Sequence, residues 1–154
     1  MSTSVGDTRG SPNRNRARSV RVLVDTSSLL ALSRSGDQYH QSAVRLARRH
    51  LGSGGRFVGT TLILSELYSH LLYLRGARDA REVVTRLLND PVHEWLGVPE
   101  DLVREALAGW LSRFADQDFS LVDAVSFEVM RREKVSHAFA FDRHFEVAGF
   151  QLLR

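Results

Sequence analysis

Four acidic residues occupy positions from which carboxylates could act together. Two of them, Asp25 and Asp142, end the short apolar runs VRVLVD and HAFAFD, which are typical of buried strands. Ligands bind outside the carboxyl ends of the strands in an open parallel sheet, so both aspartates can reach one point. Glu66 and Asp123 instead interrupt the apolar faces of the helical segments TLILSELYSHLL and FSLVDAVSFEVM. Because an unpaired buried carboxylate is unstable, these two acids need a cation or a hydrogen-bond network nearby.

The donor atoms of this set favour a hard divalent cation. All four side chains offer oxygen, and the chain has no cysteine and no clustered pair of histidines, which argues against zinc. An ion held by carboxylates can polarise a phosphoryl oxygen and supply hydroxide at neutral pH, which suits phosphodiester hydrolysis. Without the ion, the acids would repel a phosphate substrate. We therefore predict a Mg²⁺ or Mn²⁺ site held by Asp25, Glu66, Asp123 and Asp142.

Two of the acids also have a purely structural explanation at the start of a helix. Asp25 precedes a helical segment, and aspartate is a preferred capping residue there, although Ser27 or Ser28 could cap the same helix. Ser120 and Asp123 form the pattern S-x-x-D, which is itself a capping signature. For Asp123 taken alone, capping is the better explanation, so its place in a metal site depends on the other acids.

The remaining two acids have simpler explanations as well. Glu66 could face solvent and pair with Arg75 or Arg81, and Asp142 could belong to a turn with the arginine that follows it. None of these explanations accounts for all four acids together, at two strand ends and on two apolar helices. The prediction of a shared acidic site rests on that combination.

The elements that would carry these acids alternate between strands and helices. A length of 154 residues, with 43% hydrophobic and 25% charged residues, fits one globular domain. Apolar runs bounded by turn residues predict five strands, at residues 20–25, 56–61, 92–98, 137–142 and 149–153. Helical spacing predicts six helices, at residues 27–32, 37–51, 61–75, 79–89, 99–114 and 120–134. This alternation implies right-handed crossovers and a three-layer α/β/α fold with a central, mostly parallel sheet.

The beginning of the chain differs from the rest in composition. It combines Gly, Ser, Pro, Asn and Arg with almost no apolar side chains, so we predict a disordered basic tail at residues 1–19 and a folded domain at residues 20–154. The net charge of +3 also comes from this end, because residues 1–20 contain four arginines and one aspartate, whereas residues 21–154 contain 17 basic and 17 acidic groups. Charge alone therefore does not identify the folded part as a nucleic-acid-binding domain.

Other features of the composition exclude some kinds of site and indicate where the protein is found. The absence of cysteine excludes disulfides, thiolate metal sites and cysteine nucleophiles. No apolar run approaches the ~20 residues that span a bilayer, and the N-terminus lacks the apolar stretch of a signal peptide, so we expect a cytoplasmic protein without membrane contact. Of the 21 basic residues only Lys134 is not arginine. Arginine suits phosphate contacts, although genome composition explains this bias more simply.

Three segments of the chain resemble the PIN domains of VapC-type toxins. They are VDTSSLLAL at residues 24–32, SELYSHLL at residues 65–72, and FSLVDAVSFEVMRREKVSHAFAFDRHFEVAGFQLL at residues 119–153. The segments occur in the order of that family and at similar separations, and the last one, from S-L-x-D-A through F-D-x-x-F to A-G-F, is the most specific. The resemblance covers residues 20–153 and implies that residues 20–154 form a PIN domain.

The resemblance also implies an activity and a set of site residues. It assigns the four acids of the active site, in chain order, to Asp25, Glu66, Asp123 and Asp142. Ser27 corresponds to the hydroxyl residue that supports the first acid, and we expect Asp116 and Asp118 to be loop residues near the site. The implied protein is a Mg²⁺- or Mn²⁺-dependent endoribonuclease that cuts structured RNA, either tRNA or rRNA. It would act as a homodimer and as the toxin of a toxin–antitoxin pair, inhibited by a small cognate antitoxin.

Competing functions fit the sequence less well. A non-catalytic PIN-like module could bind RNA or a protein partner, but a degenerate site of that kind would have lost at least one carboxylate. Phosphatases of the haloacid-dehalogenase type need a second aspartate two residues after the first, where this chain has Ser27. Receiver domains need a further acid before it, where this chain has Val24. Flap-type nucleases carry more acids and helices than residues 21–154 can supply.

Overall fold

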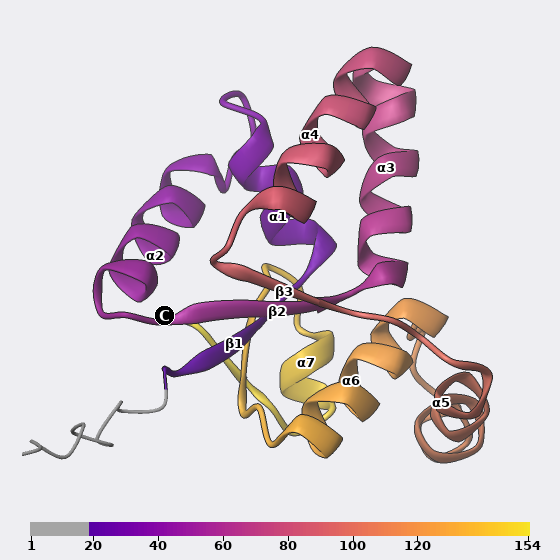
Figure 1. Ribbon diagram of the computed structural model, residues 1–154. Helices are drawn as coiled ribbons and strands as arrows, with labels where there is room; N and C mark the ends of the chain where they lie inside the picture. The colour runs from indigo at the N-terminus through magenta and orange to yellow at the C-terminus, as the bar shows by residue number, and fades with distance from the viewer. Residues whose placement is uncertain (1–18) are drawn as a thin grey trace, which may run out of the picture.

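The five strands form one parallel sheet, as the computed structural model of residues 19–154 shows (Figure 1). The strands are β1 (Arg21–Val24), β2 (Arg56–Thr60), β3 (His93–Leu96), β4 (His137–Phe139) and β5 (Gln151–Leu152). Their order in the sheet is β3-β2-β1-β4-β5, and every pair of neighbours is parallel. Except for Ser19, the predicted tail lies outside the described residues, so it remains a prediction.

β1 lies at the centre of the sheet and fixes where a ligand site can form. Its residues Val22, Leu23 and Val24 are each no more than 1% exposed, as expected for a strand covered on both faces. The chain continues from β1 to β2 on one side and returns later to β4 on the other. This reversal leaves a crevice at the carboxyl ends of β1 and β4, where open α/β sheets bind their ligands.

Helices cover both faces of the sheet and complete the three predicted layers (Figure 1). One layer consists of α1 (Thr26–Ser33), α2 (His40–Gly52), α3 (Thr61–Arg75) and α4 (Ala77–Asn89). The other consists of α5 (Glu100–Glu105), the π-helical segment η1 (Ala106–Leu111), α6 (Leu121–Glu133) and α7 (His144–Val147). The three-layer α/β/α architecture is confirmed. Within residues 19–154, no helix has the length and apolar character needed to cross a membrane.

α6 is the most deeply buried helix, and a buried acid anchors it. All of its residues from Asp123 to Met130 are buried. Glu128 accepts hydrogen bonds from Trp110 Nε1 of η1 at 3.0 Å and from Arg131 Nη2 at 2.6 Å. The bonded Arg131 guanidinium, with help from Trp110 and Arg132, lowers the pKa of Glu128 to about 2. This network ties α6, which carries Asp123, to the neighbouring η1.

Several predicted boundaries are wrong. The helix predicted at 99–114 divides into α5 and η1, where the hydrogen-bond pattern widens to that of a π-helix. The helix predicted from residue 37 begins at His40, because the Asp37 carboxylate accepts the backbone N–H of Tyr39 and forms a turn there. The first helix begins at Thr26. The short α7 was not predicted.

Candidate active site

A pocket of about 310 Å³ gathers the four predicted acids at the carboxyl ends of β1 and β4. Its lining includes Asp25, Glu66, Asp123 and Asp142, together with Asp118 and the two histidines His70 and His144. The acids come from four different elements: the end of β1, α3, α6 and the segment after β4. Among residues 19–154, no arginine or lysine lines the pocket. The site is therefore a concentration of negative charge at the point where the sheet topology reverses.

Asp25 is both a helix cap and a pocket residue. It follows β1 directly, and its Oδ2 accepts the backbone N–H of Ser27 at 3.1 Å and the Ser27 hydroxyl at 2.7 Å. Capping of α1 by Asp25 is thus confirmed, and capping by Ser27 or Ser28 is wrong. The Ser27 hydroxyl also accepts the N–H of Phe141 at 3.1 Å. One serine therefore connects Asp25 to the segment that carries Asp142.

The charge of Asp25 is poorly compensated. The residue is only 5% exposed, and this burial raises its pKa from 3.8 to about 7. Repulsion from Asp142 and Asp123 acts in the same direction, while the two hydrogen bonds from Ser27 oppose the rise. The carboxyl group therefore keeps its proton to a higher pH than an ordinary aspartate does. A cation in the pocket would offset both the burial and the repulsion, and would favour the ionised form.

Asp123 also combines a cap with a place in the pocket. Its backbone N–H donates to Ser120 Oγ at 3.0 Å, and its Oδ2 accepts the backbone N–H of Ser120 at 2.8 Å, so the predicted capping box is present. The same Oδ2 lies 3.0 Å from Nδ1 of His144. Both contacts engage one oxygen of the carboxylate. Capping and exposure of Asp123 to the pocket are therefore compatible.

Asp142 lies beyond the end of β4. The prediction that Asp142 ends this strand is therefore wrong. β4 stops at Phe139 because α1 supplies hydroxyl partners for the next backbone groups. Ser28 donates to the Phe139 carbonyl at 2.6 Å, and Ser27 accepts the N–H of Phe141. Asp142 Oδ1 then accepts the N–H of His144 at 2.9 Å, which forms the turn before α7. The alternative explanation of Asp142 as a turn residue is therefore confirmed, and this turn brings Asp142 to the pocket.

Glu66 is held by a hydroxyl group at the start of α1. Its Oε2 accepts the Thr26 hydroxyl at 2.6 Å. The alternative that Glu66 pairs with Arg75 or Arg81 is wrong, since Arg75 pairs with Asp79 at 3.3 Å and neither arginine contacts Glu66. Thr26 follows Asp25 directly. Two consecutive residues of the chain therefore supply one acid of the pocket and a hydrogen bond to another.

The four carboxylates share one pattern. In each, a single oxygen accepts the hydrogen bonds described above, and the second oxygen accepts none from the described residues. Oxygen donors without a competing cationic side chain fit a hard divalent ion. In residues 19–154, no group of three or more Asp, Glu and His side chains is close enough to bind a metal ion as it stands. An ion that bound in this pocket would have to draw the carboxylates together against their repulsion.

Sequence reasoning missed three residues of the pocket. His70 follows Glu66 by four positions on α3, a spacing that places both on one side of a helix and could have been noticed. His144 follows Asp142 by two positions, but its contact with Asp123 depends on the fold. For Thr26, the only signal in the sequence is its position next to Asp25. Asp118 lines the pocket, and Asp116 does not appear among the lining residues.

Comparison with known proteins agrees with this architecture. The PIN domain family matches residues 22–151. The 23S rRNA-specific endonuclease VapC20 of Mycobacterium tuberculosis, found in two strains, is 32% identical over 137 residues, which cover 86% of this chain and 98% of the relative. The crystal structure of M. tuberculosis VapC20, described as a sarcin–ricin loop cleaving toxin, has a TM-score of 0.74 and 34% identity and covers 84% of this chain and 95% of that chain. The chain therefore belongs to the PIN-domain family.

Proposed function

We propose that this protein is a metal-dependent endoribonuclease that hydrolyses phosphodiester bonds at the acidic pocket. The observation that carries the proposal is the convergence of four carboxylates from four elements, with no Arg or Lys of residues 19–154 in the lining of the pocket. A protein that used these acids only as helix caps would need neither Glu66 nor Asp142 there. The raised pKa of the buried Asp25 is a further sign of a site arranged for a ligand.

Asp25, Glu66, Asp123 and Asp142 are the residues that would hold Mg²⁺ or Mn²⁺, and each has one oxygen that accepts no hydrogen bond from residues 19–154. Such an ion, when bound, polarises the phosphoryl oxygen and lowers the pKa of water. The chain's own contribution is to fix the carboxylates. Ser27 orients Asp25 through two hydrogen bonds, and the capping box holds Asp123 at the start of α6.

We propose ribosomal RNA as the substrate and place it ahead of tRNA. The relative that spans almost the same length is named as a 23S rRNA-specific endonuclease, and its structure is described as that of a sarcin–ricin loop cleaving toxin. By the same likeness, the protein would be the toxin of a pair with a small antitoxin. A homodimer and an antitoxin both need apolar surface, and α3 and α4 expose Leu72, Tyr73, Leu74 and Leu88, with Tyr73 91% exposed.

The proposal is tested by incubating the protein with ribosomes, naked 23S rRNA and tRNA, in Mg²⁺ and in EDTA. Primer extension across the sarcin–ricin loop should show a single new 5′ end in Mg²⁺ and none in EDTA. Asp25→Asn should abolish this product. Asp37→Asn is the matched control, because Asp37 accepts a similar backbone hydrogen bond, from Tyr39, but does not line the pocket.

Three outcomes separate the possibilities. Cleavage of tRNA but not of 23S rRNA would keep the nuclease and overturn the substrate. Cleavage that continues in EDTA would overturn the role of the metal. Binding of RNA without cleavage of any substrate would favour the non-catalytic module instead.

A further inference from the structure

The outer face of α2 is strongly basic. The sequence contains no aspartate or glutamate between Asp37 and Glu66, and within that interval α2 carries Arg45, Arg48 and Arg49, all exposed. A shallow surface pocket on this helix is lined by His40, Gln41, Val44, Arg45 and Arg48. Because acidic and basic groups balance over residues 21–154, this helix is a local departure from a neutral domain.

Within the part of the chain that the structure describes, the arginines of α2 have no acidic partners. Eight arginines elsewhere in the described chain form ion pairs, among them Arg86 with Glu82 and Arg104 with Glu100. Arg45 and Arg48 form none within residues 19–154, and Arg45 donates only to the Ser42 hydroxyl, at 3.2 Å. Favourable interaction with the helix dipole does not explain them, because the basic residues of the last turn are Arg49 and His50.

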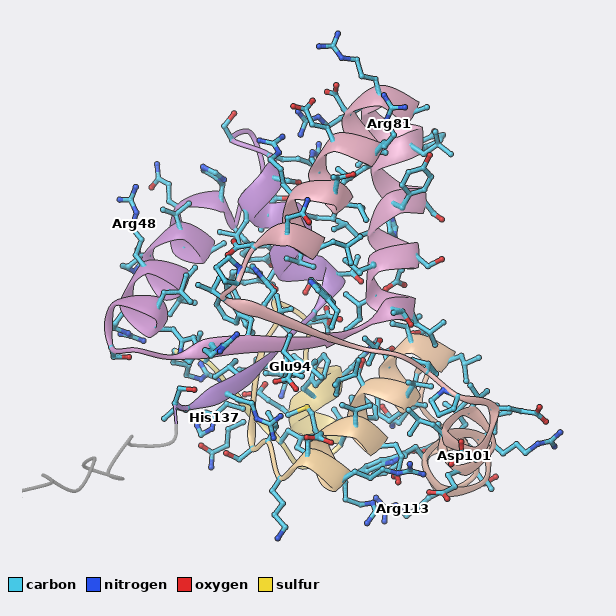
Figure 2. The ribbon with its side chains drawn as sticks, in the orientation of Figure 1. Arg48, Arg81, Glu94, Asp101, Arg113 and His137 are labelled. Carbon is cyan, nitrogen blue, oxygen red and sulfur yellow. The ribbon has the colours of Figure 1, made fainter. Side chains whose placement is uncertain are left out.

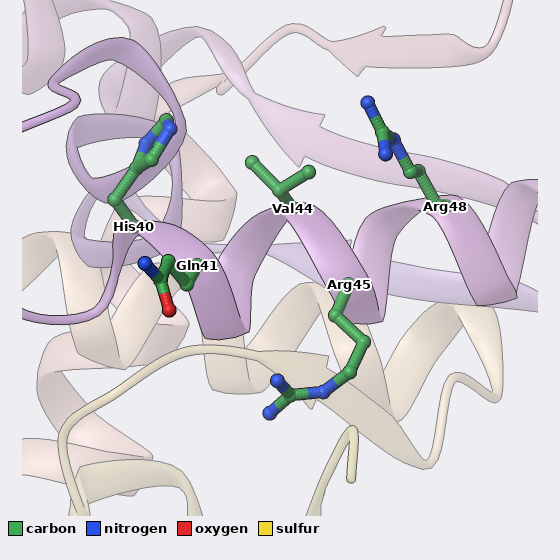
Figure 3. Close-up of a pocket in the computed structure, with 5 residues that line it drawn as sticks. All are labelled: His40, Gln41, Val44, Arg45 and Arg48. Carbon is green, nitrogen blue, oxygen red and sulfur yellow. The ribbon is translucent and has the colours of Figure 1, made fainter.

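The two arginines lie along neighbouring rows of the same exposed surface. Figure 3 shows His40, Val44 and Arg48 following one another along the helix, with Gln41 and Arg45 on the adjoining row. Figure 2 shows Arg48 extending outward from α2. Two guanidinium groups on either side of a shallow hollow, without carboxylates to neutralise them, form a surface suited to a polyanion.

α2 also begins beside the acidic pocket. Tyr39, the residue before α2, stacks on Phe141 with ring centroids 4.6 Å apart and an angle of 8° between the rings, and Phe141 immediately precedes Asp142. From Tyr39 to Arg48 the helix rises about 13 Å. Nucleic acid carries one phosphate per about 3.4 Å of axis in each strand, so this length is matched by several phosphates.

We propose that the face of α2 defined by Arg45 and Arg48 binds backbone phosphates of the RNA strand as it leaves the active-site pocket past Tyr39. This inference rests on the proposed function and extends it to the part of the substrate that is not cut. The inference also explains how a phosphate backbone could approach the pocket although its acids repel phosphate. The basic face supplies attraction at a distance from them. An acidic segment of a protein partner is the competing occupant, and repeating phosphates fit better because the basic surface continues along the helix.

The test compares two double variants of the full chain that lose the same charge. Arg45→Gln/Arg48→Gln removes the basic face, and Arg86→Gln/Arg104→Gln removes two exposed arginines that are already paired with glutamate. Binding is measured in the Asp25→Asn background, so that RNA stays intact, by fluorescence anisotropy of a synthetic RNA hairpin that carries the sarcin–ricin loop. The titration is repeated over a series of KCl concentrations, and thermal melting checks that each variant is folded.

We expect the α2 variant to bind the hairpin about tenfold more weakly at low salt. The slope of log affinity against log salt should become shallower by about 1.5, because each lost phosphate contact accounts for about 0.7 to 0.9. In the catalytically intact chain, KM for the hairpin should rise while kcat stays unchanged. Cleavage of a dinucleotide, whose single internucleotide phosphate is the one that is cut, should be equal in both variants.

Salt slopes that agree for the two double variants would overturn the inference, even if the wild-type protein cuts RNA. Loss of antitoxin binding with unchanged RNA affinity would assign α2 to the protein partner and overturn it as well. If the wild-type protein cuts no RNA but the slopes differ as expected, the RNA-binding face stands and the proposed catalytic function fails. The two proposals are therefore distinguished by the same set of measurements.

Discussion

Asp25→Asn removes the charge of the most buried acid of the pocket and keeps its cap, since asparagine also accepts hydrogen bonds at the start of a helix. In the wild-type protein the pKa of Asp25 rises from 3.8 to about 7 on folding, mainly through burial. Between these values the folded state keeps a proton that the unfolded chain has released, so the free energy of unfolding falls as pH rises. At about 1.4 kcal/mol per pKa unit, the loss reaches about 4 kcal/mol near pH 8.

The asparagine variant does not carry this penalty. In EDTA it should match the wild type near pH 4 and exceed its free energy of unfolding by up to about 4 kcal/mol near pH 8. Urea unfolding followed by circular dichroism over this pH range measures the difference. Asp37→Asn serves as the control, because Asp37 accepts the N–H of Tyr39 at 2.8 Å but lies outside the pocket, and its difference from wild type should not grow with pH.

A difference between Asp25→Asn and wild type that stays constant over the whole pH range would refute the reasoning. The buried charge would then be compensated by something other than its two serine hydrogen bonds. Metal provides a second check on the same variant. Mg²⁺ at 100 times its dissociation constant should stabilise the wild type by about 2.7 kcal/mol and should have little effect on Asp25→Asn.

Other perturbations follow from single contacts. Ser27→Ala removes the hydroxyl that donates to Asp25 and accepts the N–H of Phe141. It should lower the free energy of unfolding, measured in urea, by about 1–3 kcal/mol and raise the pKa of Asp25 further. His144→Ala removes the contact to Asp123 and should weaken Mg²⁺ binding by about 10- to 100-fold in calorimetry, with no change in the circular dichroism spectrum. The lowered pKa of Glu128 stabilises the folded protein above pH 4.5, so stability should fall as pH drops from 4.5 towards 2. This acid-dependent loss should be smaller in Glu128→Gln, which starts from a lower free energy of unfolding at neutral pH.

The strands and the four acids could be predicted because their signals are local. Val22, Leu23 and Val24 form an apolar run that only a doubly covered strand explains, and the acid after it is visible in the sequence. The end of β4 could not be predicted in this way. It depends on the hydroxyl groups of Ser27 and Ser28, which contact the β4 segment across more than a hundred residues of chain.

In the sequence, capping of a helix and a place in the acidic site are alternative explanations of Asp25 and Asp123, and the structure shows that each residue combines both. A carboxylate has two oxygens, and one of them is enough to cap a helix. His144 escaped prediction for a different reason. His144 contacts Asp123, which lies 21 residues away in the chain, and the residues next to His144 in the sequence do not indicate that contact.

The order of strands also bears on when the acidic pocket can form during synthesis of the chain. Asp142 follows β4, which pairs with β1, although the Ser27 hydroxyl and the Phe141 amide that join their ends are 114 residues apart. Translation delivers the N-terminal part first, at about 5–20 residues per second. The emerging chain therefore contains Asp25 and Glu66 long before the pocket can close around them. If ribosomal RNA is the substrate, as proposed, the ribosome that is making the chain meets no complete acidic pocket before Asp142 has emerged.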